Sequence, residues 1–151
     1  MEVVYMGIFS NFWNDSRTER EFVESGYKCC TRTNDMGHRC GYVMVPLEHP
    51  ADGMSYDKAH ESFDIDVDGG LTFSRSFEAG TVFGWDAAHA WHLKDVSIMS
   101  DDFKEFYDAH PERRHESRYG YMVDADMAER ETRRLARQMR EIADGERRVR
   151  H

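Results

Sequence analysis

The chain has 151 residues, of which 13% are aromatic and 32% are charged, and its formal net charge is −9. This length favours a single domain with a core large enough to fold alone, and no apolar run approaches the roughly 20 residues that a membrane-spanning helix needs. The acidic balance argues against direct nucleic-acid binding, which requires a basic face that displaces counterions.

The cysteines and the charge distribution indicate the compartment and the organisation of the chain. The opening residues lack the basic region and cleavage site of a signal peptide, and an odd count of three cysteines makes a poor disulfide framework. We therefore expect a cytoplasmic protein. Residues 1–111 hold 20 acidic and 9 basic side chains, whereas residues 112–151 hold 9 and 11. We expect one domain over 1–151, with an acidic body (about 1–111), then a basic loop and C-terminal helix (about 112–147).

The first half of the chain predicts one helix and a hairpin. Residues 2–9 favour a strand. Ser16, with Glu19 three residues later, resembles a capping box, and it predicts a short helix over about 16–25 that Gly26 closes. Two further strands are expected to form an antiparallel hairpin around a turn at 34–37, and they span 27–33 and 41–45.

The middle of the chain predicts short strands and one short helix. A long polar loop is expected over 46–62. Alternation predicts strands at 64–67 and 71–74, which the two glycines between them break into a hairpin or a bulge. The remaining elements are a strand at 81–85, a turn at 86–92, a short helix at 101–109 and a basic loop at 110–120.

The C-terminal helix has the clearest pattern. Asp124 or Asp126 can cap a helix that runs to about Ala143, with Gly145 just beyond its end. One apolar stripe recurs at helical spacing, with Thr132 within it, and consists of Met127, Leu135, Met139 and Ile142. Two opposite-charge pairs at i,i+4 spacing are Glu129–Arg133 and Arg137–Glu141. The expected fold is α+β: a small, mostly antiparallel sheet with a short N-terminal helix and a long C-terminal amphipathic helix.

Two motifs in the middle of the chain, Asp64–Phe73 and Phe83–His92, combine acids or histidines with glycines and aromatics. Hard carboxylates and imidazoles are ligands that zinc and other divalent metals accept. The candidate metal ligands are His49, Asp66, Asp86 and His89. The spacing is not diagnostic, and the alternative is that Asp86 caps a turn while the histidines fill a polar seam.

Three other kinds of site have weaker support in the sequence. A thiolate zinc site from Cys29, Cys30, Cys40 and His38 is disfavoured because adjacent strand residues point to opposite faces. Nucleophilic catalysis lacks a Gly-x-Ser-x-Gly elbow. The arginines near the C-terminus have no interleaved aromatic residues to support an RNA contact.

The acidic residues suggest a recognition surface. Carboxylates on a rigid scaffold can imitate a row of phosphates and occupy a basic groove, although a solvated charged face is the ordinary alternative. The three acids in Asp64–Asp68 would share one face of a strand, where like charges repel. The candidate partner-binding residues are Asp52, Asp57, Asp64, Asp66, Asp68, Asp101 and Asp102.

Four segments resemble motifs of small proteins encoded by phages and prophages of actinobacteria. They are Gly37–Pro46, His49-Pro50, Asp66–Phe73 and Phe83–His89. The chain departs from that pattern at Asp68, where the resembling proteins tend to have histidine, and at Trp91-His92, where they tend to have Gly-Asp. The resemblance implies a context, since many such accessory proteins are compact acidic inhibitors of host defence, including anti-CRISPR proteins.

The resemblance and the acidic body together lead to one expected function. The chain is expected to inhibit a host defence system, such as a CRISPR effector, by stoichiometric binding that competes with nucleic acid. The first alternative is a metal-dependent enzyme or metal-stabilised binding protein that uses the Asp86-x-x-His89 region. A second alternative is an accessory protein that oligomerises through the C-terminal helix.

Overall fold

The computed structural model describes residues 17–114 and 119–149, so the strand expected over 2–9 and the cap at Ser16 lie outside the described residues. Within them, one antiparallel five-stranded sheet has the order β1-β2-β3-β5-β4. Its strands are β1 (Thr18–Glu24), β2 (Tyr27–Thr33), β3 (Arg39–Pro46), β4 (Phe73–Phe77) and β5 (Gly80–Asp86).

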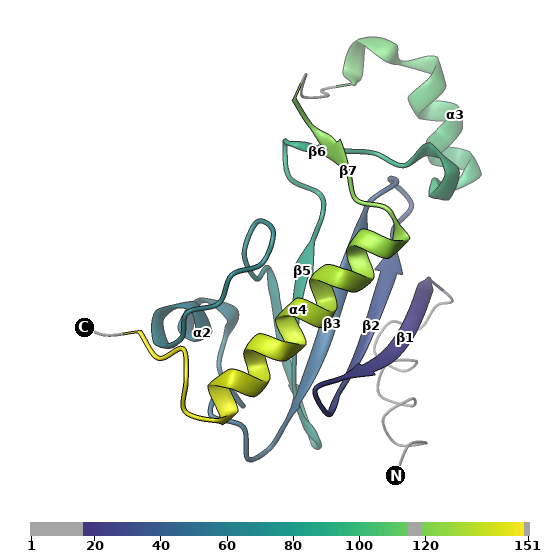
Figure 1. Ribbon diagram of the computed structural model, residues 1–151. Helices are drawn as coiled ribbons and strands as arrows, with labels where there is room; N and C mark the ends of the chain where they lie inside the picture. The colour runs from purple at the N-terminus through teal and green to yellow at the C-terminus, as the bar shows by residue number, and fades with distance from the viewer. Residues whose placement is uncertain (1–16, 115–118, 150–151) are drawn as a thin grey trace.

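The long helix α4 lies across one face of this sheet (Figure 1). The helices of the described residues are α2 (Tyr56–Ser62), α3 (Asp101–Ala109) and α4 (Ala125–Ala143), with short 3₁₀ turns η1 (Val96–Ile98) and η2 (Pro111–Arg113). A two-residue parallel pair joins β6 (His92–Leu93) to β7 (Tyr121–Met122). This arrangement confirms the expected α+β fold, and no helix in the described part of the chain could cross a bilayer.

The β2–β3 hairpin confirms its prediction, but the helix expected over 16–25 is wrong, because its described part forms strand β1. Ser25 and Gly26 have φ of 55° and 85°. Two consecutive residues with positive φ form the tight turn that matches the twist of a hairpin. Pairing with β2 therefore overrides the local capping signal, and β1 shows the alternating exposure of a strand.

The segment between α2 and β4 also differs from the prediction. The strand expected at 64–67 is wrong, because this stretch is extended but unpaired, and β4 pairs with β5 instead. Ile65 and Val67 are nevertheless buried in the core. The Gln138 side chain replaces a neighbouring strand, since its Oε1 accepts from the Asp66 N–H and its Nε2 donates to the Asp66 carbonyl, both at 2.8 Å.

The loop expected over 46–62 contains helix α2 at its end. Ser55 caps this helix, because its hydroxyl accepts the Lys58 N–H at 3.1 Å. Upstream of the cap, the loop is folded against the core, where Ala51 is fully buried. The His49 ring holds this stretch in place with both of its nitrogens, one at the Met139 carbonyl and one at the Ala51 N–H.

The terminal helix follows its prediction closely. Asp124 is the N-cap and accepts the Met127 N–H at 2.8 Å. Most of the predicted stripe is buried against β2 and β3, with Met127 only partly buried. The Glu129–Arg133 pair forms at 2.8 Å, whereas Arg137 pairs with Glu24 and Glu141 with Arg147.

Gly41 in β3 allows this close packing of helix on sheet. A Cβ atom at Gly41 would lie 1.9 Å from Thr132 Oγ1 and 2.5 Å from Trp85 Nε1. The Trp85 indole N–H donates to Thr132 Oγ1 at 3.0 Å inside the core. The bare backbone of Gly41 therefore leaves room for a buried hydrogen bond between β5 and α4.

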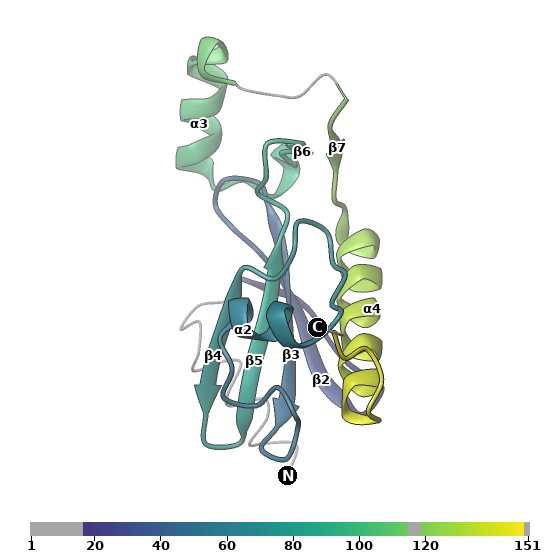
Figure 2. The same cartoon turned by 90° about the vertical axis from the view of Figure 1, so that its left-hand side faces the viewer.

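The elements from β6 to η2, together with β7, project beyond one end of the sheet (Figure 2). Arg39, which is 5% exposed, fastens this projection to the body. Its guanidinium donates to Asp95 at 2.8 Å, to Glu19 at 2.8 and 3.1 Å, and to the Val123 carbonyl at 3.0 Å. One buried cation thus joins β1, the N-cap of η1 and the segment that leads into α4.

Candidate functional site

The two sequence motifs meet in space beside α4. The turn at Asp68-Gly69-Gly70 lies against the connection between β5 and β6. Gly69 has φ of 76°, and a Cβ atom there would lie 2.3 Å from the His89 ring. A glycine is needed at this position for both the backbone conformation and the space that the imidazole occupies.

Asp68 is the centre of this site, and its carboxylate accepts three side-chain hydrogen bonds. Oδ2 accepts from the Tyr121 hydroxyl at 2.6 Å and from His92 Nε2 at 2.8 Å, and Oδ1 accepts from the Trp91 indole N–H at 3.3 Å. His92 Nδ1 accepts the His89 backbone N–H at 3.1 Å. Because Nδ1 is an acceptor, the proton of the neutral ring lies on Nε2, which donates to Asp68.

These contacts change the pKa values of two groups in opposite directions. Burial alone would raise the pKa of Asp68, but the hydrogen bonds from Tyr121 and His92 outweigh it and leave that pKa below its usual range. Burial and the neighbouring Asp68 carboxylate raise the pKa of Tyr121 to about 12. Asp68 is therefore ionised and Tyr121 is a neutral donor at neutral pH.

Two aromatic rings of this site reach the surface. Trp91 is 40% exposed and Tyr121 is 41% exposed. The Trp91 ring stacks on His89, with ring centroids 4.5 Å apart and an interplanar angle of 13°. Tyr121 packs edge-on against His92, whose side chain is fully buried. We refer to Trp91, Tyr121 and His89 as the aromatic platform.

Asp86, at the end of β5, joins the site to β4. Its Oδ2 accepts the Thr72 hydroxyl at 2.6 Å, and its Oδ1 accepts the Ala88 N–H at 3.1 Å. His89 Nδ1 lies 3.9 Å from Asp86 Oδ1, which is too long for a hydrogen bond. The expected turn cap at Asp86 is therefore present. The Asp86 carboxylate and the His89 imidazole also resemble a general-base pair. The His89 ring, however, is covered by Trp91 and by the Gly69 backbone, which restricts the access of a substrate to it.

The four predicted metal ligands are distributed over separate parts of the fold. Asp86 and His89 lie together, whereas both ring nitrogens of His49 bond to backbone groups and Asp66 pairs with Arg134 at 3.1 Å. Within residues 17–114 and 119–149, no group of three or more His, Cys, Asp or Glu side chains is placed to hold a metal ion.

The disfavoured thiolate site is divided by the sheet, because Cys29 lies on the opposite face from Cys30. Cys29 faces α4 and Cys30 packs in the smaller cluster on the opposite face of the sheet, as adjacent strand residues must. Both are buried. The buried environment raises the pKa of each thiol above its usual value. Neither thiol has the low pKa that a nucleophile requires.

The seven predicted partner-binding acids do not share one environment. Asp52 accepts the Thr81 hydroxyl at 2.8 Å, and Asp68 is held inside the site. Asp64 and Asp66 are exposed, but Arg147 and Arg134 lie 3.6 and 3.1 Å from their carboxylates. The remaining three lie on helices that are well separated in both views: Asp57 on α2, and Asp101 and Asp102 on α3 (Figures 1 and 2).

Helix α3 carries an acidic ridge, which we define as Asp101, Asp102, Glu105 and Asp108. At 100° per residue these four side chains fall within a sector of about 120°. Phe103 and Tyr107 lie on the opposite side of the helix, where the Lys94 ammonium is 5.4 and 5.5 Å from their ring centroids. Within the described residues, the ion pair found on the ridge joins Asp108 to Arg114 at 3.7 Å.

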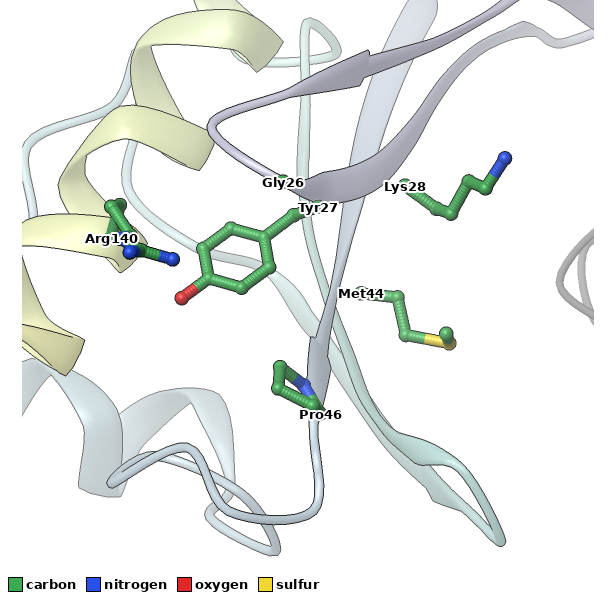
Figure 3. Close-up of a pocket in the computed structure, with 6 residues that line it drawn as sticks. All are labelled: Gly26, Tyr27, Lys28, Met44, Pro46 and Arg140. Atoms are coloured by element: carbon green, nitrogen blue, oxygen red, sulfur yellow. The ribbon is translucent and has the colours of Figure 1, made fainter. Parts of the chain in front are cut away.

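Two hollows in the described surface are lined mainly by residues outside the site and the ridge, although one of them includes Glu131, which accepts the Asp68 N–H at 3.3 Å. One of about 320 Å³ is lined by Gly26, Tyr27, Lys28, Met44, Pro46 and Arg140 (Figure 3). Burial raises the pKa of Tyr27, and the adjacent Arg140 partly offsets that effect. In Figure 3 the Lys28 side chain extends away from Arg140, so these two cations do not converge on one point. A second, shallow hollow lies over the arginine-rich side of α4.

Sequence reasoning grouped Asp101, Asp102 and Glu105, but it missed Asp108 as the fourth member of the ridge and it missed the contribution of Tyr121. Tyr121 reaches Asp68 because β7 pairs with β6, and a two-residue parallel pair leaves no pattern in a sequence. The ridge could have been recognised from the helical spacing of Asp101, Glu105 and Asp108. Comparisons of the chain with protein-family models, curated proteins and solved structures find no match.

Proposed function

We propose that this chain inhibits a host defence complex by stoichiometric binding, with the acidic ridge of α3 occupying a basic groove that otherwise receives nucleic acid. The proposal includes a phage-type origin, action in the host cytoplasm and a CRISPR effector as the kind of target. The observation that carries it is the ridge itself, because four carboxylates lie on one side of a helix that projects from the body (Figure 2).

The dimensions of the ridge suit this role. Asp101 and Asp108 are seven residues apart, which corresponds to about 10 Å along a helix axis. One strand of duplex DNA carries about three phosphates over that length. The ridge therefore presents four carboxylates, one of which is paired with Arg114, over a distance where a nucleic-acid strand presents about three phosphates.

The rest of the acidic body supports the same mode of binding. A protein with a net charge of −9 attracts a basic surface at long range and repels nucleic acid. The carboxylates of Asp64 and Asp66 contribute less, because neighbouring arginines offset their charge. The proposed contact is therefore made by α3. Asp57, which is exposed on α2, lies outside this contact.

The test begins with affinity capture from a defence-competent host lysate, washed at low and then high salt, with mass spectrometry of the retained proteins. The captured complex is then purified, and its nucleic-acid binding is measured against increasing amounts of the chain. We expect binding to be abolished at about one chain per complex. We also expect high salt to release the chain, because screening shortens the Debye length from about 10 Å at 0.1 M to 3 Å at 1 M.

Two variants with the same change in net charge separate local from global electrostatics. The ridge variant carries Asp101→Asn, Asp102→Asn and Glu105→Gln, and the control carries Glu48→Gln, Asp57→Asn and Glu61→Gln on exposed positions near and within α2. We expect the ridge variant to lose inhibition and the control to keep it. Equal behaviour of the two variants would contradict the ridge mechanism, as would a captured complex that binds nucleic acid normally with excess chain.

A further inference from the structure

The aromatic platform has a property that surface aromatics ordinarily lack: its rings are held in fixed orientations. The Asp68 carboxylate holds Trp91 and Tyr121 directly, and His89 supports the inner face of Trp91. The side chain of Asp68 is 18% exposed, so a carboxylate is largely withdrawn from water at this point. Burying a charge is unfavourable unless donors compensate it, and here two of the three donors belong to half-exposed rings.

Rigid, half-exposed Trp and Tyr side chains are the residues that dominate protein recognition. They contribute large contact areas at a low cost in conformational entropy, and they are enriched at binding hot spots. The platform therefore has the composition of an interface centre.

The charges around the platform define the chemistry of its partner. The Asp68 carboxylate lies at the polar edges of Trp91 and Tyr121, whose N–H and O–H groups donate to it, and the Asp86 carboxylate lies 3.9 Å from His89 Nδ1. Two cations on adjoining elements are already engaged, since Arg134 donates to Glu131 at 2.6 Å and Lys94 lies over the rings of α3. Trp and Tyr faces attract cations through the ring quadrupole, and a guanidinium also stacks on them as a plane.

We propose that the aromatic platform is a docking point for an arginine side chain carried by a segment of a partner protein. The guanidinium stacks on the exposed face of Trp91 and beside Tyr121, where Asp68 and Asp86 supply the complementary charge. This site uses residues outside the acidic ridge, so the inference goes beyond the proposed inhibitory role and holds whether or not that role is confirmed.

The probe is a short peptide of alternating arginine and glycine, titrated into the ¹⁵N-labelled full chain by NMR. The readout is the indole N–H signal of Trp91, which is assigned by its loss in Trp91→Phe. We expect a saturable shift of this signal in the wild-type chain. In a separate affinity measurement by fluorescence anisotropy of a labelled peptide, we expect Trp91→Ala to weaken binding by roughly two- to fivefold for the loss of one ring. The indole signal of Trp85, which is bonded to Thr132 in the core, reports that each variant remains folded.

Three matched probes decide the chemistry. The same peptide with citrulline, which is neutral and has nearly the same shape, is expected not to bind, and a lysine–glycine peptide is expected to bind more weakly. An oligothymidylate is expected to leave the Trp91 signal unchanged. Equal binding of the citrulline or lysine peptide, a shift with oligothymidylate, or no saturable shift at all would overturn the proposal.

Two variants complete the design. If Trp91→Ala fails to fold, Trp91→Phe replaces it in an affinity measurement that needs no indole, such as fluorescence anisotropy of a labelled peptide. A smaller loss of affinity is then expected, because phenylalanine attracts cations less strongly than tryptophan. Peptide affinity should be similar in the ridge variant and in wild type, whereas a large loss in the ridge variant would show that the peptide binds α3 instead.

Discussion

Replacing Asp68 with asparagine tests the central hydrogen-bond network of the site. An amide has one acceptor oxygen, so in Asp68→Asn at least one of the three donors faces an NH₂ group. If the oxygen stays with Tyr121 and His92, which are 2.6 and 2.8 Å away, the Trp91 indole loses its partner. A hydrogen bond to a charged group contributes about 1.5–3 kcal/mol. The lost bond is the longest of the three, so we expect a loss of about 2 kcal/mol.

The assay is urea unfolding followed by circular dichroism, together with thermal melting. For a chain of this length, 2 kcal/mol corresponds to a fall in Tm of about 4–8 °C. The matched control is Asp64→Asn, because the Asp64 side chain is 75% exposed and its arginine partner is 3.6 Å away. That surface substitution is expected to change stability by less than about 0.5 kcal/mol. Equal effects of the two substitutions would refute the account of the network.

The difference in stability between wild type and Asp68→Asn should depend on pH in a defined direction. The pKa of Asp68 is lower in the folded chain than its unfolded value of about 3.9. Its contribution to stability is therefore fully present above the unfolded pKa and is lost as the pH falls through the folded pKa. The stability difference between wild type and Asp68→Asn should narrow below about pH 4. A difference that stays constant down to pH 2 would contradict the assigned ionisation of Asp68.

Three other predictions concern helix–sheet packing, a buried ion pair and the reactivity of buried thiols. Gly41→Ala places a methyl group against Thr132, so we expect about 3 kcal/mol of destabilisation in urea unfolding, and a wild-type midpoint would contradict the close helix–sheet contact. Arg39→Met leaves the Glu19 and Asp95 carboxylates uncompensated, so the free energy of unfolding should fall by about 3–5 kcal/mol. Adding Glu19→Gln should recover part of this loss. No recovery would exclude uncompensated charge as the cause. The Cys29 and Cys30 thiols are buried and their pKa values are raised, so they should react with iodoacetamide at pH 8 only after unfolding. Rapid labelling of either residue in the folded chain would contradict this.

The elements that depend on local signals were predictable from the sequence. The C-terminal helix combines a cap at Asp124 with an apolar stripe at helical spacing, and both are local properties. The β2–β3 hairpin follows from two strand-like segments around a tight turn. The prediction of a helix over 16–25 was wrong because a serine followed by a glutamate, and a glycine at the end, can also flank a strand and its turn. The alternation of Arg20, Phe22 and Glu24 toward α4 was the competing signal.

The candidate site was predicted only in part, because its assembly depends on contacts between distant segments. The sequence identified both motifs as unusual, and the structure brings Asp68 to the turn that holds His89 and His92. The spacing of His49 in the sequence does not reveal whether it can bind a metal. In the structure, both of its ring nitrogens bond to backbone groups and hold the 46–55 loop in place. The acidic row at 64–68 alternates as predicted, but arginines from α4 and the C-terminal segment lie beside two of its carboxylates.

The bond between Gln138 and the Asp66 backbone has a consequence for the order of folding. A strand that joins a sheet finds its partners along a ladder, but Asp66, in the extended stretch at 64–67, has both of its backbone partners on one helical side chain. That side chain is in position only after α4 has docked on β2 and β3. The stretch, and with it the turn that carries Asp68, should therefore be completed after the folding transition state. Weakening this bond would then accelerate unfolding and leave the folding rate nearly unchanged.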